Sequence, residues 1–277
     1  MRWGDWGADL AQADLRRLIE GCLEARVTAF DHADIYGDYT EEARFGRVLA
    51  EAPHLREGMT LITKCGIRMV AEARPAHRFK SYDSGAAHIR ASVEASLRAL
   101  RTDRLDVLLL HRPDYLMDAA EVADVFAELR DEGKVLAFGT SNFTVAQFEL
   151  LAGCWPDLLT NQIEYSLTQL APLSDGTLDQ AQRLGCPPMI WSPLGGGALL
   201  NAGDALTGKL DEVAARLGST PDRVAYAWLL RHPSRPTLVT GSSRLERIVR
   251  AREAEAIALD RETWYELLEA ARGHEVA

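Results

Sequence analysis

The chain of 277 residues is 47% hydrophobic and 26% charged, which is typical of a globular protein with a large core and argues against a disordered or fibrous one. Its formal net charge of −10 disfavours nucleic acid and anionic membranes as partners, because both select basic surfaces. No apolar run approaches the roughly 18 residues that cross a bilayer, and the N-terminus lacks the apolar stretch of a secretory signal. We therefore expect a cytoplasmic protein that is not embedded in a membrane. The four cysteines form no C-x-x-C pair, so they predict free thiols and no metal site.

Helical patterns alternate along the chain with short apolar runs. Apolar residues recur with helical spacing over residues 15–23, 122–129 and 210–217, so each segment predicts a helix that buries one face. Thr220-Pro221-Asp222 is typical of another helix N-terminus. Runs without polar alternation are typical of strands buried on both faces, as in a parallel sheet covered by helices. Seven such runs are present, at residues 27–30, 60–63, 107–110, 135–138, 158–160, 189–191 and 237–239.

This alternation predicts an α/β fold, a (β/α)8 TIM barrel formed by a single domain over residues 1–277. The count of seven strands is one short of the eight that close such a barrel. Two alternatives remain open for the missing first strand. Either the chain begins after it, or residues 1–8 close the barrel in a reduced form, so we expect the first strand to be absent or shortened.

Four titratable residues are predicted to meet at one rim of this barrel. Barrel enzymes carry their reactive groups at the C-terminal ends of the strands. Asp31, Lys64 and His111 each end or follow a predicted strand, and Tyr36 comes five residues after Asp31 in the next loop. A single Asp or Lys at a strand end is usually a solvated or salt-bridged residue without a catalytic role. Four such groups on one rim favour an active site instead.

The segments around these residues resemble those of the aldo-keto reductase family. The resemblance covers nearly the whole chain in the family's order and is highly specific, although any one segment alone would be weak. The matching segments are Phe30-Asp31-His32-Ala33-Asp34-Ile35-Tyr36-Gly37, Thr63-Lys64, Leu109-Leu110-His111-Arg112-Pro113-Asp114, Gly139-Thr140-Ser141-Asn142-Phe143, Asn161-Gln162-Ile163-Glu164-Tyr165, Trp191-Ser192-Pro193-Leu194 and Gly241-Ser242-Ser243.

This resemblance implies an oxidoreductase that transfers a hydride from NADPH to the carbonyl carbon of a small aldehyde or ketone, with Tyr36 as the proton donor. A tyrosine with its usual pKa of about 10 is a reluctant acid near neutral pH, and an adjacent ammonium lowers that pKa. The family gives this role to the equivalent of Lys64. Asp31 would hold Lys64 by an ion pair, and His111 would hydrogen-bond and orient the carbonyl oxygen. His32 stands where the family commonly has Thr or Ser, and we interpret it as a packing variant.

The resemblance also assigns residues to the nicotinamide end of the cofactor. Ser141, Asn142 and Gln162 would contact the carboxamide, whose donor and acceptor need mixed polar partners. Trp191 would stack on one face of the nicotinamide ring. Two alternatives remain on spacing alone: Ser141 or Asn142 caps the helix that begins near Thr144, and Trp191 is only a buried residue at a strand end.

Two further segments are candidates for the phosphates of the dinucleotide. In the turn at residues 192–197, three glycines would let backbone approach the pyrophosphate, although such a turn also suits any flexible loop. Residues 241–247 follow the last predicted strand and open a helix, where free N–H groups favour anions. Two arginines there would bind the adenosine 2′-phosphate, which predicts NADPH (NADP+) as the cofactor. The residues assigned to the phosphates are Ser192, Leu194, Gly196, Gly241, Ser242, Ser243, Arg244 and Arg247.

The expected partner is a small carbonyl substrate, and the sequence does not predict an oligomeric state. Aromatic residues in segments expected at the rim either wall a substrate pocket or only pack the loops. Two other functions remain as alternatives: a cofactor-binding sensing or accessory subunit with vestigial turnover, and an isomerase that uses a Lys–Asp pair without nicotinamide. The aromatic residues concerned are Trp3, Trp6, Phe79, Tyr82 and Tyr115.

Overall fold

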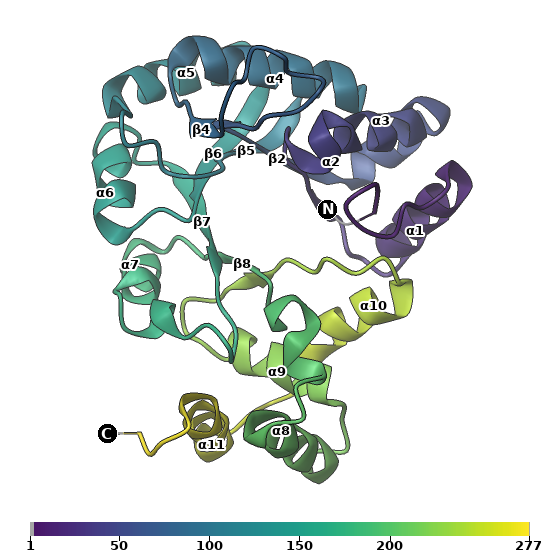
Figure 1. The fold of residues 1–277 in the computed structure, drawn as a ribbon, viewed down its shortest axis with the longest axis vertical. Coiled ribbons are helices and arrows are strands. Elements are labelled where there is room, and N and C mark those ends of the chain that lie inside the picture. The colour runs from purple at the N-terminus through teal and green to yellow at the C-terminus, as the bar shows by residue number, and fades with distance from the viewer. Residues whose placement is uncertain (1–2, 277) are drawn as a thin grey trace. The chain divides into compact units, whose positions relative to one another are not determined.

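A computed structural model describes residues 3–276 of the chain (Figure 1). The chain divides into two compact units. The first comprises the residues up to Asn161 together with Ser242–Leu245, and the second comprises Gln162–Gly241 and the residues from Glu246 onward. Helices and parallel strands alternate in both units, as the sequence predicts.

Three neighbouring strands of the first unit have their C-terminal ends at the same edge of a sheet. The β1–β2, β2–β5 and β5–β6 pairings are parallel, and Asp31 lies opposite Ile62, while Lys64 lies opposite Leu109. Because parallel strands end on the same side of a sheet, residues at these positions come together. In sheet order the strands are β1 (Ala29–Asp31), β2 (Thr60–Cys65), β5 (Leu105–Leu110), β6 (Val135–Ser141) and β7 (Leu158–Glu164), the last of which continues into the second unit.

The helices of the first unit pack their apolar stripes inward, and one contact between them requires glycine. The predicted helix over residues 15–23 is confirmed as α1, with Leu15, Leu18 and Ile19 buried. A Cβ on Gly46 of α3 would lie 2.0 Å from the carbonyl oxygen of Ala99 in α4, so only glycine allows these two helices to approach so closely. The helical elements are α1 (Gln12–Glu24), α2 (Tyr36–Tyr39), α3 (Glu41–Glu51), η1 (Pro53–Gly58), α4 (Ala86–Leu100), α5 (Ala119–Asp131) and α6 (Val145–Cys154).

A short antiparallel hairpin follows β2, and the sequence analysis did not predict it. Its strands, β3 (Ile67–Arg68) and β4 (Ser81–Tyr82), have two residues each, too few to show an alternating pattern. The hydroxyl of Tyr39 in α2 accepts a hydrogen bond from the backbone N–H of Met69 at 3.0 Å. This bond ties the hairpin to the helix that begins with Tyr36.

The second unit continues the parallel sheet. Met189 in β8 lies opposite both Gln162 in β7 and Thr237 in β9. The helix predicted from Thr220-Pro221-Asp222 is confirmed as α9, with Pro221 in its first turn. The elements that follow β7 are η2 (Ala171–Leu173), α7 (Thr177–Leu184), β8 (Met189–Trp191), η3 (Gly195–Leu200), α8 (Ala205–Arg216), α9 (Pro221–Leu230), β9 (Thr237–Leu238), α10 (Leu245–Glu253), η4 (Ala254–Ala256) and α11 (Arg261–Arg272).

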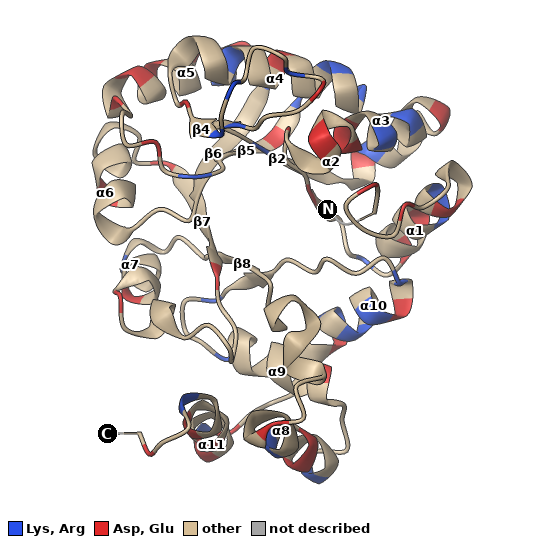
Figure 2. Ribbon diagram, in the orientation of Figure 1, with Lys and Arg blue, Asp and Glu red and all other residues tan. Residues whose placement is uncertain are grey.

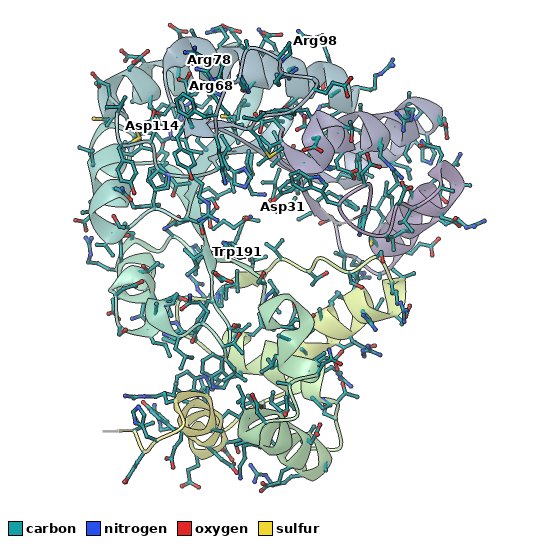
Figure 3. The ribbon with its side chains drawn as sticks, in the orientation of Figure 1. Asp31, Arg68, Arg78, Arg98, Asp114 and Trp191 are labelled. Atoms are coloured by element: carbon teal, nitrogen blue, oxygen red, sulfur yellow. The ribbon has the colours of Figure 1, made fainter. Side chains whose placement is uncertain are left out.

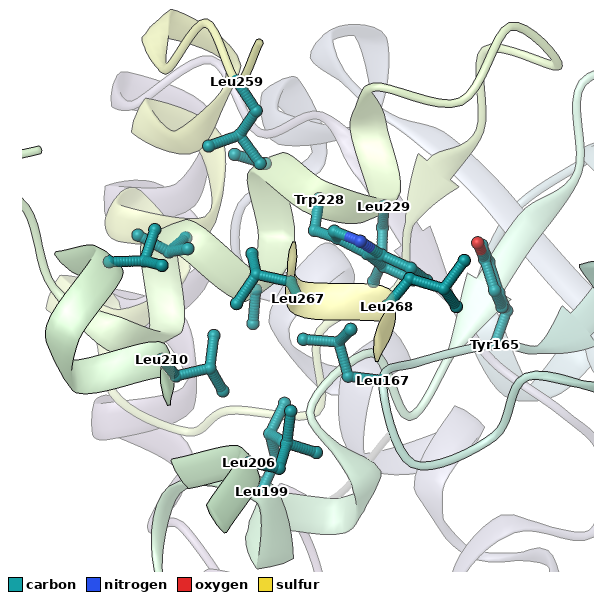
Figure 4. Close-up of a cluster of buried hydrophobic side chains, with 14 of the residues drawn as sticks. Tyr165, Leu167, Leu199, Leu206, Leu210, Trp228, Leu229, Leu259, Leu267 and Leu268 are labelled. Carbon is teal, nitrogen blue, oxygen red and sulfur yellow. The ribbon is translucent and has the colours of Figure 1, made fainter. Parts of the chain in front are cut away.

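The core of the second unit is organised around two tryptophans. Trp228 of α9 and Trp264 of α11 stack with their ring centroids 4.9 Å apart. Each indole N–H donates to the other residue's backbone carbonyl at 3.0 Å, so both polar groups are satisfied inside an apolar cluster. Tyr165 and leucines from several elements surround the Trp228 ring (Figure 4). This packing fixes α11 against α9.

The structure confirms all seven predicted strands, in the order β1-β2-β5-β6-β7-β8-β9 of one parallel sheet. Residues 3–11 form turns and bends without a strand, and β1 and β9 are the two end members of the sheet order. The observed architecture is therefore an α/β fold whose main sheet has seven strands. Within residues 3–276, no eighth strand joins this sheet. No helix within residues 3–276 is long and apolar enough to cross a membrane.

Candidate active site

The four predicted catalytic residues lie together in the first unit. Asp31 is the last residue of β1, Lys64 lies near the end of β2, and Tyr36 begins α2. His111 directly follows β5, and its backbone N–H donates to the carbonyl of Cys65 at 2.8 Å, which holds the end of β5 beside the end of β2. Asp31 is labelled at this edge in Figure 3. The predicted convergence of these side chains is confirmed for the described structure.

Lys64 is the centre of this arrangement. It is fully buried, yet its Nζ donates to three oxygens: Asp31 Oδ2 at 2.7 Å, the carbonyl of His32 at 2.9 Å and the phenol oxygen of Tyr36 at 3.1 Å. An ammonium has three N–H donors, so each donor of Lys64 has a partner. Burial lowers the pKa of Lys64, but the negative charge of Asp31 and the contact with Tyr36 outweigh it and leave the pKa raised. Lys64 is therefore a buried cation at neutral pH.

Tyr36 contacts the Lys64 ammonium through its hydroxyl and two other aromatic residues through its ring. Its oxygen accepts from the Lys64 ammonium, which stabilises negative charge on that oxygen. Because this bond uses a lone pair, the hydroxyl proton can be donated elsewhere. The ring of Tyr36 meets the His111 ring edge to face, with the ring centroids 5.7 Å apart. The centroid of the Trp6 ring lies 6.3 Å from that of the Tyr36 ring.

His111 is buried and neutral. Burial lowers its pKa well below 6.5, and the positive charges of Lys64 and Arg112 lower it further. Its Nδ1 has no hydrogen-bond partner within residues 3–276. A neutral imidazole carries one N–H donor, so His111 can donate a hydrogen bond to an oxygen beside Tyr36 without adding charge.

Two carboxyl groups, those of Asp34 and Glu42, lie close to the four predicted catalytic residues, which are called the tetrad below. The sequence motifs did not single these two carboxyl groups out. Glu42 of α3 accepts a hydrogen bond from the Thr63 hydroxyl at 2.5 Å, next to Lys64 in β2. Burial raises the pKa of Glu42, and burial together with the charge of Glu42 raises the pKa of Asp34 to about 8. Their only sequence signal is proximity to the motif, since an Asp or Glu usually lies at the surface.

His32 is a packing residue, as the sequence analysis interpreted it. Its side chain is 1% exposed and meets Phe45 edge to face at 4.5 Å. Neither ring nitrogen has a hydrogen-bond partner within the described chain. Burial and the charge of Lys64 lower its pKa well below 6.5, so His32 stays neutral beside that ammonium.

The structure rules out Ser141 and Asn142 as the cap of the next helix. Thr144 caps α6 instead, with its hydroxyl accepting from the Gln147 N–H in a capping box. Ser141 is the last residue of β6, at the same sheet edge as His111, and its Oγ accepts from Asn142 Nδ2 at 2.7 Å. Asn142 has a φ of +60°, which is uncommon for residues other than glycine and is enriched at functional sites.

The second unit contains two of the predicted nicotinamide residues, Gln162 and Trp191, and the predicted pyrophosphate turn. Gln162 is buried in β7, and Trp191 ends β8 in a half-buried position (Figure 3). Ser192 has a φ of +51°, and the three glycines that follow Leu194 all have positive φ. A Cβ on Gly196 would meet no atom within 4 Å, so conformation rather than crowding requires glycine there.

The predicted 2′-phosphate segment has one anchor that the sequence did not reveal. The buried Trp3 donates its indole N–H to the carbonyl of Ser242 at 2.7 Å. Ser242 Oγ in turn accepts from the backbone N–H of Arg244 at 3.1 Å, so the first part of the segment forms a local turn. The remaining members are Gly241, Ser243 and Arg247, the last within the first turn of α10. The side chains of Arg244 and Arg247 are exposed.

Comparison with known proteins agrees with this geometry. The model of the Aldo/keto reductase family matches residues 1–272. Oxidoreductase YdhF from Escherichia coli is 48% identical over 98% of this chain and 91% of its own length. A 6-dehydroglucose reductase from Agrobacterium fabrum is 45% identical over 100% of this chain and 93% of its own. The crystal structure of an aldo/keto reductase from Klebsiella pneumoniae, in complex with NADP and acetate, superimposes with a TM-score of 0.77 at 25% identity, covering 95% of this chain and 86% of that one. The resemblance seen in the motifs is thus confirmed, and the chain belongs to the aldo/keto reductase family of oxidoreductases.

Proposed function

We propose that the protein reduces the carbonyl group of a small aldehyde or ketone with NADPH and that Tyr36 donates the proton. One observation carries this proposal: a fully buried Lys64 ammonium contacts the carboxylate of Asp31 and the phenol of Tyr36 at once. Placing a cation in a buried site is costly unless it is paired and hydrogen-bonded. A structural ion pair needs Asp31 but not Tyr36, so the second contact favours acid–base chemistry.

Each residue of the tetrad has a defined part in this reaction. NADPH, when bound, supplies the hydride that adds to the carbonyl carbon. Tyr36 gives its proton to the carbonyl oxygen as negative charge develops there, and Lys64 stabilises the phenolate that remains. Asp31 keeps Lys64 charged and in place, and the neutral His111 donates a hydrogen bond that orients the carbonyl oxygen.

The residues present fit NADP(H) as the cofactor. Ser141, Asn142 and Gln162 offer both donors and acceptors to a carboxamide, and Trp191 offers a flat ring. Around Gly196 the backbone is unobstructed, as the close approach of a pyrophosphate requires. We assign the remaining contacts to the phosphates, with the two arginines at the 2′-phosphate because guanidinium groups suit phosphate oxygens. Those residues are Ser192, Leu194, Gly241, Ser242, Ser243, Arg244 and Arg247.

We further infer that the substrate is a small polar aldehyde of the sugar type. The relative from Agrobacterium fabrum is named a 6-dehydroglucose reductase, and the match covers 100% of this chain and 93% of the relative. The substrate of that relative is a starting point for a screen of carbonyl compounds. We also propose that the enzyme acts in the cytoplasm as a single (β/α)8 barrel domain over residues 1–277, with a first strand that is absent or shortened.

Replacing the proton donor tests the assignment directly. Tyr36→Phe removes the phenol hydroxyl and retains the ring contacts with His111 and Trp6. Loss of a positioned general acid costs about 10²–10⁴ in rate, so carbonyl reduction should fall by that factor. The affinity for NADPH should change by less than about fivefold, because other residues are proposed to hold the dinucleotide. A fivefold change corresponds to about 1 kcal/mol.

Both quantities are measured on the same preparation, NADPH binding by quenching of tryptophan fluorescence and turnover by NADPH absorbance. A Tyr36→Phe protein that reduces carbonyls at the parental rate contradicts the assignment. An unmutated protein that binds NADPH but reduces nothing in a broad aldehyde and ketone panel contradicts the proposed reaction and favours a cofactor-binding accessory subunit.

A further inference from the structure

The β3–β4 hairpin concentrates positive charge in a chain whose net charge is −10. Between residues 66 and 82 there are four basic residues and one acidic residue, Glu72, so this segment carries a formal charge of +3. Figure 2 shows the basic positions in blue along the loop that leads into β4. The four basic residues are Arg68, Arg74, Arg78 and Lys80.

Two of these cations are neutralised or packed, and two are not. Arg68 pairs with Asp83 at 3.4 Å, and the guanidinium of Arg74 lies 4.6 Å from the centre of the Tyr39 ring. Arg78 and Lys80 are exposed and form no salt bridge with any carboxylate of residues 3–276. An exposed cation without a partner is common at protein surfaces, so the position of Arg78 and Lys80 decides what they can bind.

Two tethers hold the hairpin beside the catalytic tetrad. The backbone N–H of Asp83 donates to the carbonyl of Gly66 at 2.9 Å, which closes the hairpin two residues after Lys64. Asp114, three residues after His111, accepts hydrogen bonds at Oδ2 from the Ser84 N–H at 2.9 Å and from its hydroxyl at 3.0 Å. Figure 3 labels Arg68, Arg78 and Asp114 in this region. The hairpin that carries Lys80 and the segment that carries Arg112 are therefore joined through Asp114.

The charges near His111 reflect this arrangement. The positive charges that act on its ring include those of Lys64, Arg112 and Lys80. Lys64 is balanced by Asp31 at 2.7 Å, whereas Lys80 has no such partner within residues 3–276. The charges of Arg112 and Lys80 therefore act on the same ring, and local positive charge attracts anions even in a protein of opposite net charge.

We propose that Lys80, together with Arg112, binds an oxyanion substituent, a carboxylate or a phosphate, on the carbonyl substrate that the tetrad reduces. The inference rests on the proposed function and narrows its substrate class to aldehydes or ketones that carry a negative charge. Charge-assisted hydrogen bonds from Lys and Arg to such groups are among the strongest in proteins. The exposed ring of Phe79, next to Lys80, adds an apolar surface for the substrate's carbon skeleton.

Matched pairs of substrates test the proposal. p-Carboxybenzaldehyde and p-(hydroxymethyl)benzaldehyde differ in charge but have similarly activated carbonyl groups, because neither para substituent changes the electron density of the ring much. Glyceraldehyde phosphate is compared with glyceraldehyde in the same way. We expect kcat/KM for the anionic member to exceed that for the neutral member by about 10- to 100-fold at low salt, the range of charge-assisted hydrogen bonds, and the ratio to shrink as salt is added. The two pairs show whether carboxylate or phosphate is preferred.

The Lys80→Gln variant identifies the residue responsible. It should reduce the anionic preference about tenfold, the effect of one charge-assisted hydrogen bond, through KM for the anion. Arg98→Gln is the matched control, because it removes one exposed positive charge from α4 in the same unit and should leave the preference unchanged.

Several results would overturn the proposal. If the parent reduces the charged and the neutral member of each pair equally well, the reductase function stands and the anion site does not exist. If the preference survives in a Lys80→Gln, Arg112→Gln double variant, these residues do not create it. A raised KM for NADPH in Lys80→Gln would assign the hairpin to the cofactor's phosphates instead. If the parent reduces no member of either pair or of a wider panel, the proposed function fails and the inference fails with it.

Discussion

The sheet edge of the first unit that carries the proposed tetrad, called the catalytic edge here, differs from the predicted cofactor loops in how it holds its functional groups. At the catalytic edge, strand ends present buried side chains that already contact one another, with Lys64 bonded to three oxygens. The loop at residues 192–197 instead contains three glycines with positive φ angles that are exposed or half-buried, and residues 241–244 form an exposed or half-buried turn. Reactive groups are thus preorganised by the strands, whereas the loops keep backbone accessible to a ligand. This contrast predicts different responses to mutation.

The largest effect is expected from Lys64→Met. It removes the cation that stabilises the Tyr36 phenolate, so turnover should fall by about 10²–10⁴. It also leaves Asp31 without its partner, and breaking a buried pair in this way costs about 3–5 kcal/mol of unfolding free energy. Carbonyl-dependent NADPH oxidation and urea unfolding measure the two effects.

A double variant separates chemistry from stability at this edge. In Lys64→Met, Asp31→Asn the uncompensated carboxylate is gone, so much of the stability should return. Turnover should stay low, because the ammonium beside Tyr36 is still absent. Recovery of turnover in the double variant would show that Lys64 acts only by holding the fold together.

An intermediate effect is expected at the cofactor loops, from Arg244→Ala combined with Arg247→Ala. Both side chains are exposed, so their removal should change the unfolding free energy by less than about 0.5 kcal/mol. The parent should bind NADPH more tightly than NADH by about 1–3 kcal/mol, the range of charge-assisted hydrogen bonds, and the variant should lose most of this difference. Fluorescence titrations with both cofactors measure it. An unchanged preference in the variant would remove these arginines from the 2′-phosphate site.

The same contrast explains which features the sequence predicted. Each of the seven strands is a continuous apolar run, so burial on both faces was visible in the residues themselves. The tetrad followed from strand ends and the family resemblance. The β3–β4 hairpin was not predicted, because it depends on single hydrogen bonds such as that from Met69 to Tyr39, which leave no periodic pattern. The burial of Glu42 is likewise a tertiary effect, since nothing in an acidic pair near a helix start indicates that both residues are buried.

The smallest effect concerns Asp34, whose pKa is raised to about 8 by burial and by the charge of Glu42. A carboxyl group with a raised pKa in the folded state binds its proton more tightly there than in the unfolded chain. Its contribution to stability is therefore full below the ordinary pKa of 3.8 and is lost as the pH rises toward about 8. Asp34→Asn keeps a neutral side chain of the same shape at every pH.

The effect of Asp34→Asn on the free energy of unfolding therefore depends on pH. We express it as the free energy of unfolding of the variant minus that of the parent. That difference should be near zero at about pH 4 and should grow in favour of the variant until about pH 8, because a charged carboxylate is costly to bury. Urea unfolding across this pH range measures it. Asp38→Asn is the control, since it makes the same chemical change at an exposed position in the same segment. The predicted cofactor loops contain no carboxylate at residues 192–197 or 241–244, so they cannot produce such a slope. A flat difference for Asp34→Asn would mean that the carboxylate is solvated in the folded protein, and it would remove a buried, titrating carboxyl from the catalytic edge.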